Sequence, residues 1–228
     1  MGDFAKARLN MVESQVRPNG VTDRRILEAM FAVPREVFVP EAERSLAYMD
    51  GDIPLAPAQQ GGPRRGIMAP MPLARLIQLA DIQPGELVLD VGCTTGYSTA
   101  ILARLAESVV GLECDSRLAD TATNTLVELG VDNAAVVTGP LQDGYASEGP
   151  FDAIVLGGAV QQVPDALLAQ LKEGGRLVAI VSGEGRTPPG SGRAFVFSRI
   201  RSEISRRPAF DAGAPLLPGF ARTPEFVF

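Results

Sequence analysis

Two acidic residues, each in or directly after an apolar run, are the side chains best placed to bind a polar ligand. Asp90 lies in the run 86–91, which turns through Gly92 and Gly96 into an apolar helical pattern. A second apolar run ends in Glu113. If these runs form neighbouring parallel strands, their carboxyl ends meet at the sheet edge where α/β proteins bind nucleotide cofactors. We therefore expect Glu113 to accept hydrogen bonds from the hydroxyl groups of a ribose.

The glycine spacing of the turn after the first run distinguishes between cofactors. Dinucleotide-binding folds use G-x-G-x-x-G to place a pyrophosphate at a helix N-terminus, and the segment 92–96 lacks that spacing. It is similar to the looser D-x-G-x-G-x-G turn of S-adenosylmethionine-dependent methyltransferases, with Thr94 at the middle glycine. Because a β-branched residue avoids positive φ, we expect the turn to have re-formed with Thr94 at negative φ. The alternative is a turn that keeps the glycine geometry and stores strain.

The composition excludes several classes of protein. The chain has 228 residues, of which 46% are hydrophobic, enough for the core of one α/β domain. Its formal charge is −6 and its basic residues are scattered, which argues against nucleic acid as a partner. No apolar run approaches the ~20 residues of a membrane helix, and the first residues lack a signal-peptide pattern. These features predict a cytoplasmic protein with no membrane partner.

The chain has no histidine and only two cysteines, Cys93 and Cys114. Two thiols without histidine rarely bind zinc, so we expect no metal site. A thiol with no neighbouring base is a weak nucleophile. Both cysteines are therefore interpreted as small packing residues beside the predicted cofactor turn.

Strand and helix patterns alternate through the central part of the chain, which predicts an α/β fold with a doubly wound, mostly parallel sheet. Two later strand patterns have no helix between them and predict an antiparallel edge hairpin. The predicted strands are 87–91, 109–112, 135–138, 151–156, 176–181, 194–200 and 203–207, and the predicted helices among them are 96–106, 116–129 and 164–171.

Helical patterns at 4–16 and 24–32 precede the sheet, and a segment rich in proline and glycine follows at 50–66. A short helix is predicted over 72–80. We expect one domain over residues 1–228. Its two parts are an N-terminal helical and loop extension, 1–66, and a cofactor-binding core, 67–228.

The chain resembles the protein-L-isoaspartate O-methyltransferase family from about Asn10 to its C-terminus. Segment 22–40 is similar to the family's N-terminal helix and its V-P-R-E-x-F-V signature. Segment 88–97 is similar to V-L-E-I-G-x-G-S-G-Y, and Glu113 lies on the family's ribose-binding acid. The other similar segments are 67–71 on I-S-x-P-x-M, 150–154 on the fourth strand, and 170–178 on Q-L-x-x-G-G-x-L-V.

This resemblance implies a seven-stranded, Rossmann-like class I methyltransferase fold with S-adenosyl-L-methionine as cofactor. It also implies the reaction, methyl transfer to the carboxylate of L-isoaspartyl residues in damaged proteins, a protein repair step. A carboxylate is already ionised at pH 7, so this transfer needs no general base, and we assign no catalytic residue. Three positions depart from the family: Met68 replaces a serine that contacts substrate, Thr94 a glycine, and Pro140 an aspartate.

The candidate site residues follow from these patterns. Asp90 would orient the turn or the methionine amino group, and Tyr97 would cover the cofactor or pack in the core. The departures from the family leave two alternatives open: a regulatory protein that keeps the fold and binds the cofactor, and a methyltransferase for another carboxylate or metabolite. The predicted cofactor-binding residues are Asp90, Gly92, Cys93, Thr94, Gly96, Tyr97, Glu113, Cys114, Pro140 and Leu141. The predicted substrate-binding residues are Arg64, Arg65 and Met68, since guanidinium groups pair well with carboxylates.

Overall fold

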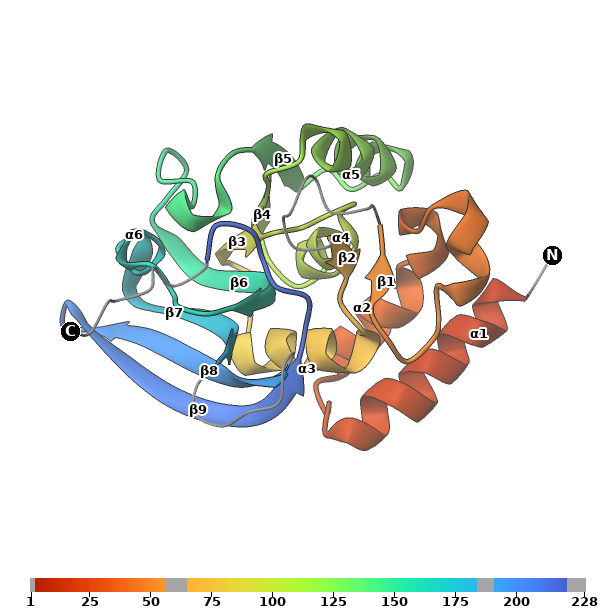
Figure 1. Ribbon diagram of the computed structural model, residues 1–228, viewed down its shortest axis with the longest axis horizontal. Helices are drawn as coiled ribbons and strands as arrows, with labels where there is room; N and C mark the ends of the chain where they lie inside the picture. Colours follow the sequence, from red (N-terminus) through yellow and green to blue (C-terminus); the bar gives the residue numbers. More distant parts are fainter. Residues whose placement is uncertain (1–2, 56–64, 184–190, 221–228) are drawn as a thin grey trace, which may run out of the picture.

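The computed structural model of this chain describes residues 3–55, 65–183 and 191–220. Its main sheet has seven strands in the order β5-β4-β3-β6-β7-β8-β9 (Figure 1). Pairing is parallel from β5 to β7, whereas β8 and β9 run antiparallel to their neighbours. The predicted doubly wound sheet with an antiparallel edge hairpin is therefore confirmed. The strands are β3 (Leu87–Val91), β4 (Ser108–Glu113), β5 (Ala134–Thr138), β6 (Phe151–Val160), β7 (Leu171–Ser182), β8 (Ser191–Ile200) and β9 (Glu203–Gly213).

Several helices begin at an aspartate whose side chain caps the first turn. Asp23 accepts from Arg25 N at 2.8 Å before α2, and Asp115 accepts from Arg117 N at 3.0 Å before α5. Such caps satisfy N–H groups that have no intrahelical acceptor. The helices are α1 (Phe4–Met11), α2 (Arg24–Ala32), α3 (Pro70–Ala80), α4 (Tyr97–Ala103), α5 (Ser116–Glu128) and α6 (Asp165–Leu168), with short π or 3₁₀ segments at Val12–Val16, Arg17–Asn19, Arg35–Phe38, Glu41–Leu46 and Leu141–Asp143. In the ranges that the structure describes, no helix is long and apolar enough to cross a membrane.

Some element ends differ from the prediction. The helix expected over 164–171 ends at Leu168, and Leu171 instead begins β7, where it pairs with Phe151 of β6. A short antiparallel pair is formed by β1 (Ile53–Pro54), inside the segment 50–66 expected to be a loop, and β2 (Gly66–Ile67), which begins at the last residue of that segment. Two residues per strand are too few for a periodic signal.

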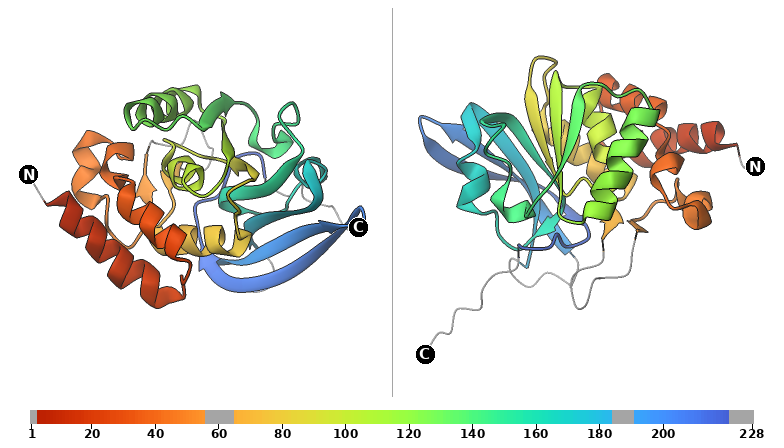
Figure 2. Two further views of the ribbon diagram at one scale, coloured as in Figure 1. Left: turned by 180° about the vertical axis from the view of Figure 1, so that it is seen from behind. Right: turned by 90° about the horizontal axis from the view of Figure 1, so that it is seen from above.

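The strands divide the apolar core into two clusters, one on each face of the sheet. Val88 belongs to the cluster that contains α3 and α4. Leu89 and Val91 belong to the opposite cluster, with Leu167 of α6. Figure 2 shows α4 and α5 on one side of the sheet and α6 on the other. Because successive strand residues point to opposite faces, Asp90 shares the α4 face with Val88.

Helix α3 connects the N-terminal helices to the sheet. It contacts β6, β7, β8 and β9 on one side and α2 on the other, and Figure 1 shows it between these two parts of the molecule. Gln78 of α3 accepts from Thr22 N at 2.7 Å and from Asp23 N at 3.1 Å. The start of α2 is thereby held on α3, and residues of α1, α2, α3 and α4 share one apolar cluster.

The segment after β9 returns to the carboxyl end of β6. Ala159 N donates to Pro215 O, and Leu217 N donates to Ala159 O, both at 2.8 Å. Leu217 and Phe220 are buried. The carboxyl edge of the sheet is thus covered in part by residues that no sequence pattern placed there.

Candidate active site

The predicted cofactor turn and the predicted ribose-binding acid lie side by side at the carboxyl edge of the sheet. Strands β3 and β4 pair in register from Leu87 with Ser108 to Val91 with Leu112, so they end together. Leu112 O accepts from Gly92 N at 2.8 Å and from Cys93 N at 3.2 Å. The turn of residues 92–96 is therefore attached to the end of β4.

Glu113 is buried and its carboxylate has several donors. Oε2 accepts from Thr94 N at 2.9 Å, and Oε1 accepts from Cys114 N at 2.9 Å and from Asp115 N at 3.1 Å. Oε2 also accepts from Nη2 of Arg65, which forms a buried ion pair with Glu113. Arg65, predicted to bind substrate, and Glu113, predicted to bind cofactor, thus belong to one site.

Thr94 has a φ of +54°, so the expectation of a negative φ was wrong. The turn has kept the geometry that a glycine would favour, closed by Gly96 N donating to Cys93 O at 2.9 Å. The physical reason lies in Glu113. In this conformation Thr94 N points at the buried carboxylate, and a charge-assisted bond from a backbone N–H is worth roughly 1.5–3 kcal/mol. That gain offsets a strain of about 1–3 kcal/mol.

Asp90 is buried on the α4 face of the sheet, and only one of its two carboxylate oxygens is hydrogen-bonded. Its Oδ2 accepts from Ser98 Oγ at 2.6 Å and from Thr99 Oγ1 at 2.7 Å. Its Oδ1 is buried and has no hydrogen-bond partner. Burial raises the pKa of Asp90 to about 6, with a smaller contribution from the charge of Glu113, although the two hydroxyls act in the opposite direction.

Paired glycines of β6 complete the site. A Cβ on Gly157 would lie 2.9 Å from Gly92 O, so only glycine lets β6 approach the turn this closely. A Cβ on Gly158 or on Gly92 would lie 2.8 Å from the side chain of Leu217. Leu217 therefore occupies the space between the turn and β6.

The segment around Met68 faces the same turn. A small cavity is lined by Met68, Gly66, Gly92, Thr94, Ser98 and Gly157, among others. Arg35, which is fully buried, donates to Met68 O and to Ala47 O, both at 2.8 Å. Met68 is thus held beside the predicted cofactor turn, and its contact with substrate stays a prediction. The other predicted substrate residue, Arg64, lies outside the described residues.

Tyr97 packs toward the N-terminal helices. Its ring lies 4.6 Å from the guanidinium carbon of Arg35 and 5.6 Å, edge to face, from the ring of Phe38. These contacts support the packing interpretation of Tyr97, and a contact with the cofactor stays a prediction. Pro140 and Leu141 follow β5 at the same sheet edge, where Leu141 is part of the apolar core, and their cofactor contacts also stay predictions.

Neither thiol is prepared for nucleophilic chemistry. Burial raises the pKa of Cys93 well above its usual value. Burial and the charge of Glu113 raise the pKa of Cys114 to about 11. Because the thiolate is the nucleophile, a raised pKa makes both thiols weak nucleophiles. Cys93 is buried, in agreement with a packing role, whereas Cys114 is exposed, so the packing interpretation does not hold for Cys114.

Sequence reasoning missed four parts of this site. Ser98 and Thr99 follow the turn directly and carry the hydroxyls that Asp90 needs, and the glycine pair of β6 ends a strand pattern, so both had local signals. Arg35 lies in the V-P-R-E segment, which carried the family resemblance without showing what the arginine contacts. Leu217 had no signal, because only the tertiary fold brings the tail to β6.

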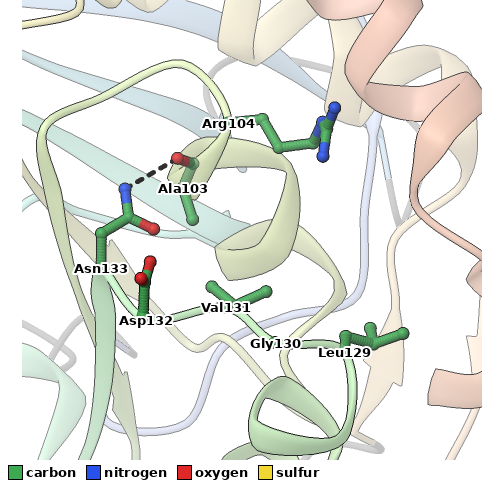
Figure 3. A pocket seen from close by; sticks show the side chains of 7 residues that line it. All are labelled: Ala103, Arg104, Leu129, Gly130, Val131, Asp132 and Asn133. Atoms are coloured by element: carbon green, nitrogen blue, oxygen red, sulfur yellow. Dashed lines mark hydrogen bonds between the residues drawn. The ribbon is translucent and has the colours of Figure 1, made fainter.

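A pocket on the opposite edge of the sheet lacks these features. It has a volume of about 420 Å³ and is lined by Ala103, Arg104, Leu129, Gly130, Val131, Asp132 and Asn133 (Figure 3). The Asn133 amide donates to Ala103 O at 2.8 Å, and no side chain of this lining has a buried polar atom without a partner. Since α/β sheets bind ligands at their carboxyl edge, we place the functional site at the turn.

Comparisons with known proteins identify relatives of the whole chain. The sequence profile of the family described as "Protein-L-isoaspartate(D-aspartate) O-methyltransferase (PCMT)" matches residues 7–188. A protein named protein-L-isoaspartate O-methyltransferase from Roseiflexus sp. (strain RS-1) is 36% identical over 98% of this chain and 97% of its own length. A solved structure titled protein-L-isoaspartate O-methyltransferase matches 93% of this chain and 66% of its own, with a TM-score of 0.80 and 24% identity. A crystal structure from Plasmodium falciparum in complex with S-adenosyl-L-homocysteine has a TM-score of 0.73 and 21% identity over 91% of this chain and 96% of its own.

The strained turn predicts that Thr94→Gly stabilises the protein. Relief of about 1–3 kcal/mol of strain exceeds the entropic cost of a new glycine, about 0.4–1 kcal/mol. The melting temperature should rise by roughly 2–4 °C, measured by calorimetry. Thr95→Gly is the matched control, since Thr95 has no positive φ and its hydroxyl donates to Phe38 O at 2.7 Å. A Thr94→Gly variant that melts lower than the wild type would contradict the strain.

The raised pKa of Asp90 predicts a pH dependence of stability. A folded-state pKa of about 6, against 3.8 for the free side chain, means that the stability due to its protonation is present below pH 4 and lost as the pH rises through 6. Asp90→Asn removes this loss. The free energy of unfolding of the variant minus that of the wild type should rise by about 2 kcal/mol from pH 4 to pH 7.

Urea titrations at each pH measure this difference. Asp152→Asn is the control, because for this variant the difference in the free energy of unfolding should change with pH in the opposite direction. Although burial opposes it, hydrogen bonds from Lys172 and from the Leu87 N–H hold the pKa of Asp152 below its usual value. A pH-independent difference for Asp90→Asn would show that Asp90 is ionised in the folded state at acidic pH.

Proposed function

This chain belongs to the protein-L-isoaspartate O-methyltransferase family, and we propose that it transfers the methyl group of S-adenosyl-L-methionine to the carboxylate of L-isoaspartyl residues in damaged proteins. The observation that carries the proposal is the position of Glu113. It ends β4 beside the turn 92–96 and is buried together with Asp90. An acid in this position is suited to the two hydroxyls of a ribose.

The residues present suit this cofactor. Glu113 would accept from the ribose, and Asp90 Oδ1, buried without a partner, is an acceptor for an ammonium or ordered water. Gly92 and Gly157 have no Cβ where the turn, β6 and Leu217 approach one another closely. The complex of the Plasmodium falciparum structure with S-adenosyl-L-homocysteine supports the choice of cofactor.

The chemistry asks for alignment rather than proton transfer. When bound, the cofactor supplies an electrophilic methyl group on a sulfonium, which is its own leaving group. The acceptor carboxylate is ionised at neutral pH, so the protein has to hold it in line and remove its water. The buried segment around Met68 and the apolar side chain of Leu217 are suited to exclude water beside the turn. A chain without histidine can therefore carry out this reaction.

The remaining expectations are part of the same proposal. The substrates would be proteins and peptides with isoaspartyl residues, and the net charge of −6 makes nucleic acid an unsuitable partner. We place the protein in the cytoplasm, where repair of ageing proteins would need it. The whole chain would act as one domain, since the N-terminal helices share an apolar cluster with α3 and α4.

A second candidate function has its own support. Met68 and Pro140 replace polar family residues, and Arg65 and Leu217 lie against the groups that would bind the cofactor. These features favour a regulatory protein or a methyltransferase for another carboxylate. Incubation with radiolabelled cofactor and either an isoaspartyl peptide or its aspartyl counterpart distinguishes the candidates. Methylation of the isoaspartyl peptide alone supports the first function.

The cofactor assignment predicts that Glu113→Ala weakens binding of S-adenosyl-L-methionine at least tenfold in calorimetry. Two charge-assisted bonds to the ribose are worth roughly 1.5–3 kcal/mol each, and loss of the Arg65 pair offsets about one of them. Glu107→Ala is the matched control, because Glu107 is exposed and directly precedes the first residue of β4. Unchanged affinity in Glu113→Ala would remove Glu113 from the site.

The position of Met68 predicts that Met68→Ser raises kcat/KM for the isoaspartyl peptide about tenfold, the value of one hydrogen bond to a charged group. Met68→Ala is the control, since it makes the same truncation without a hydroxyl. Both variants lose roughly 2–5 kcal/mol of stability, so the assay is run well below their melting temperatures. Equal activity of the two variants would show that a hydroxyl at this position does not contact the substrate.

A further inference from the structure

The carboxylate of Glu113 has no free capacity in this structure. A carboxylate offers about four lone-pair positions. The N–H groups of Thr94, Cys114 and Asp115 and the guanidinium of Arg65 are four strong donors to it, and the thiol of Cys114, at 3.4 Å from Oε1, is a fifth, weak donor. Three of these donors are backbone groups, held by the turn and by the start of α5. A ribose hydroxyl that binds Oε2 must therefore displace Arg65, whereas a second hydroxyl at Oε1 has only the weak thiol donor of Cys114 to displace.

Arg65 needs another anion once it leaves Glu113. Its side chain is 9% exposed, and its Nε is buried without a partner. A buried guanidinium without a counter-ion is strongly unfavourable. Arg65 directly precedes β2, and the next three residues, Gly66, Ile67 and Met68, line the same cavity as Gly92 and Thr94. The anion that this cavity must receive in the proposed reaction is the carboxylate of the substrate.

We propose that Arg65 exchanges partners during the reaction: it pairs with Glu113 in the free enzyme, and with the acceptor carboxylate of the isoaspartyl residue once the cofactor ribose has taken Glu113. Arg65 is then a substrate-positioning residue that is available only after the cofactor has bound. This inference rests on the proposed function and adds to it the residue that holds the acceptor and the order in which the two substrates bind.

The exchange also has a consequence for product release. Methyl transfer converts the carboxylate into a neutral ester, which cannot neutralise a guanidinium. Arg65 is again without an anion, and Glu113 is the nearest one. Its return to Glu113 competes with the ribose of the spent cofactor. The same ion pair therefore delays the binding of the peptide and promotes the release of both products.

Arg65→Gln tests the exchange through two affinities that should change in opposite directions. Without the ion pair to break, S-adenosyl-L-homocysteine should bind about tenfold more tightly in calorimetry with no peptide present. The KM for the isoaspartyl peptide should rise about tenfold, because the acceptor loses its counter-ion. Arg65→Lys keeps the positive charge but loses the bidentate geometry of the guanidinium. It should lie between the wild type and Arg65→Gln in both measurements. If Arg65 had a purely structural role, Arg65→Gln would weaken the binding of both S-adenosyl-L-homocysteine and the peptide.

The wild-type protein provides a test that needs no variant. The isoaspartyl peptide should bind at least tenfold more tightly in the presence of saturating S-adenosyl-L-homocysteine than in its absence, and the aspartyl peptide should show no such difference. Equal binding of the isoaspartyl peptide in both conditions would overturn the exchange. So would an affinity for S-adenosyl-L-homocysteine in Arg65→Gln that is unchanged or weaker.

Arg104→Gln is the matched control. It removes the same charge from an exposed residue at the far end of α4 (Figure 3), and should alter neither affinity.

Failure of the exchange and failure of the proposed function are distinguishable. A wild-type protein that methylates no isoaspartyl peptide contradicts the function, whereas the peptide-binding measurement with and without S-adenosyl-L-homocysteine still decides the exchange. A methylating enzyme whose Arg65→Gln variant keeps the wild-type KM contradicts the exchange alone.

Discussion

The burial of the Glu113 carboxylate is the constraint on which the rest of the site depends. A charge at the end of a buried strand is strongly unfavourable unless hydrogen bonds and a counter-ion replace the water that it has lost. Thr94 supplies one donor at the cost of a positive φ, the start of α5 supplies two more, and Arg65 supplies the positive charge. Three separate segments are therefore held in position by one side chain.

Asp90 lies at the same edge of the sheet but has a different environment. It has two hydroxyl donors, no counter-ion and one oxygen without a partner, and its pKa is raised to about 6. The site thus combines a raised carboxyl pKa, a strained turn and a partnerless buried atom. Each of these lowers stability, and such features are concentrated where a protein binds ligands. We interpret them as the cost of a site prepared for a polar cofactor.

The N-terminal part of the chain contributes to the site through Arg35. Its guanidinium joins Ala47 O to Met68 O and lies over the ring of Tyr97 at the start of α4. Thr95, in the turn itself, donates to Phe38 O at 2.7 Å. The segment around Met68 and the turn 92–96 are therefore both attached to the N-terminal segment around Arg35. This gives the V-P-R-E signature a physical role in aligning two halves of one site.

The sequence by itself determined the order of strands and helices, the edge hairpin, the turn and the position of Glu113 beside it. These features are local: hydrophobic periodicity and glycine spacing act over a few residues. The pairing of Arg65 with Glu113, 48 residues apart, and the packing of Leu217 against Gly92 were decided only by the tertiary structure. The φ of Thr94 belongs to the same group. A β-branched residue locally favours a negative φ. The observed positive φ is adopted because it lets Thr94 N hydrogen-bond to the buried carboxylate, and an unsatisfied buried charge is less favourable than one strained residue.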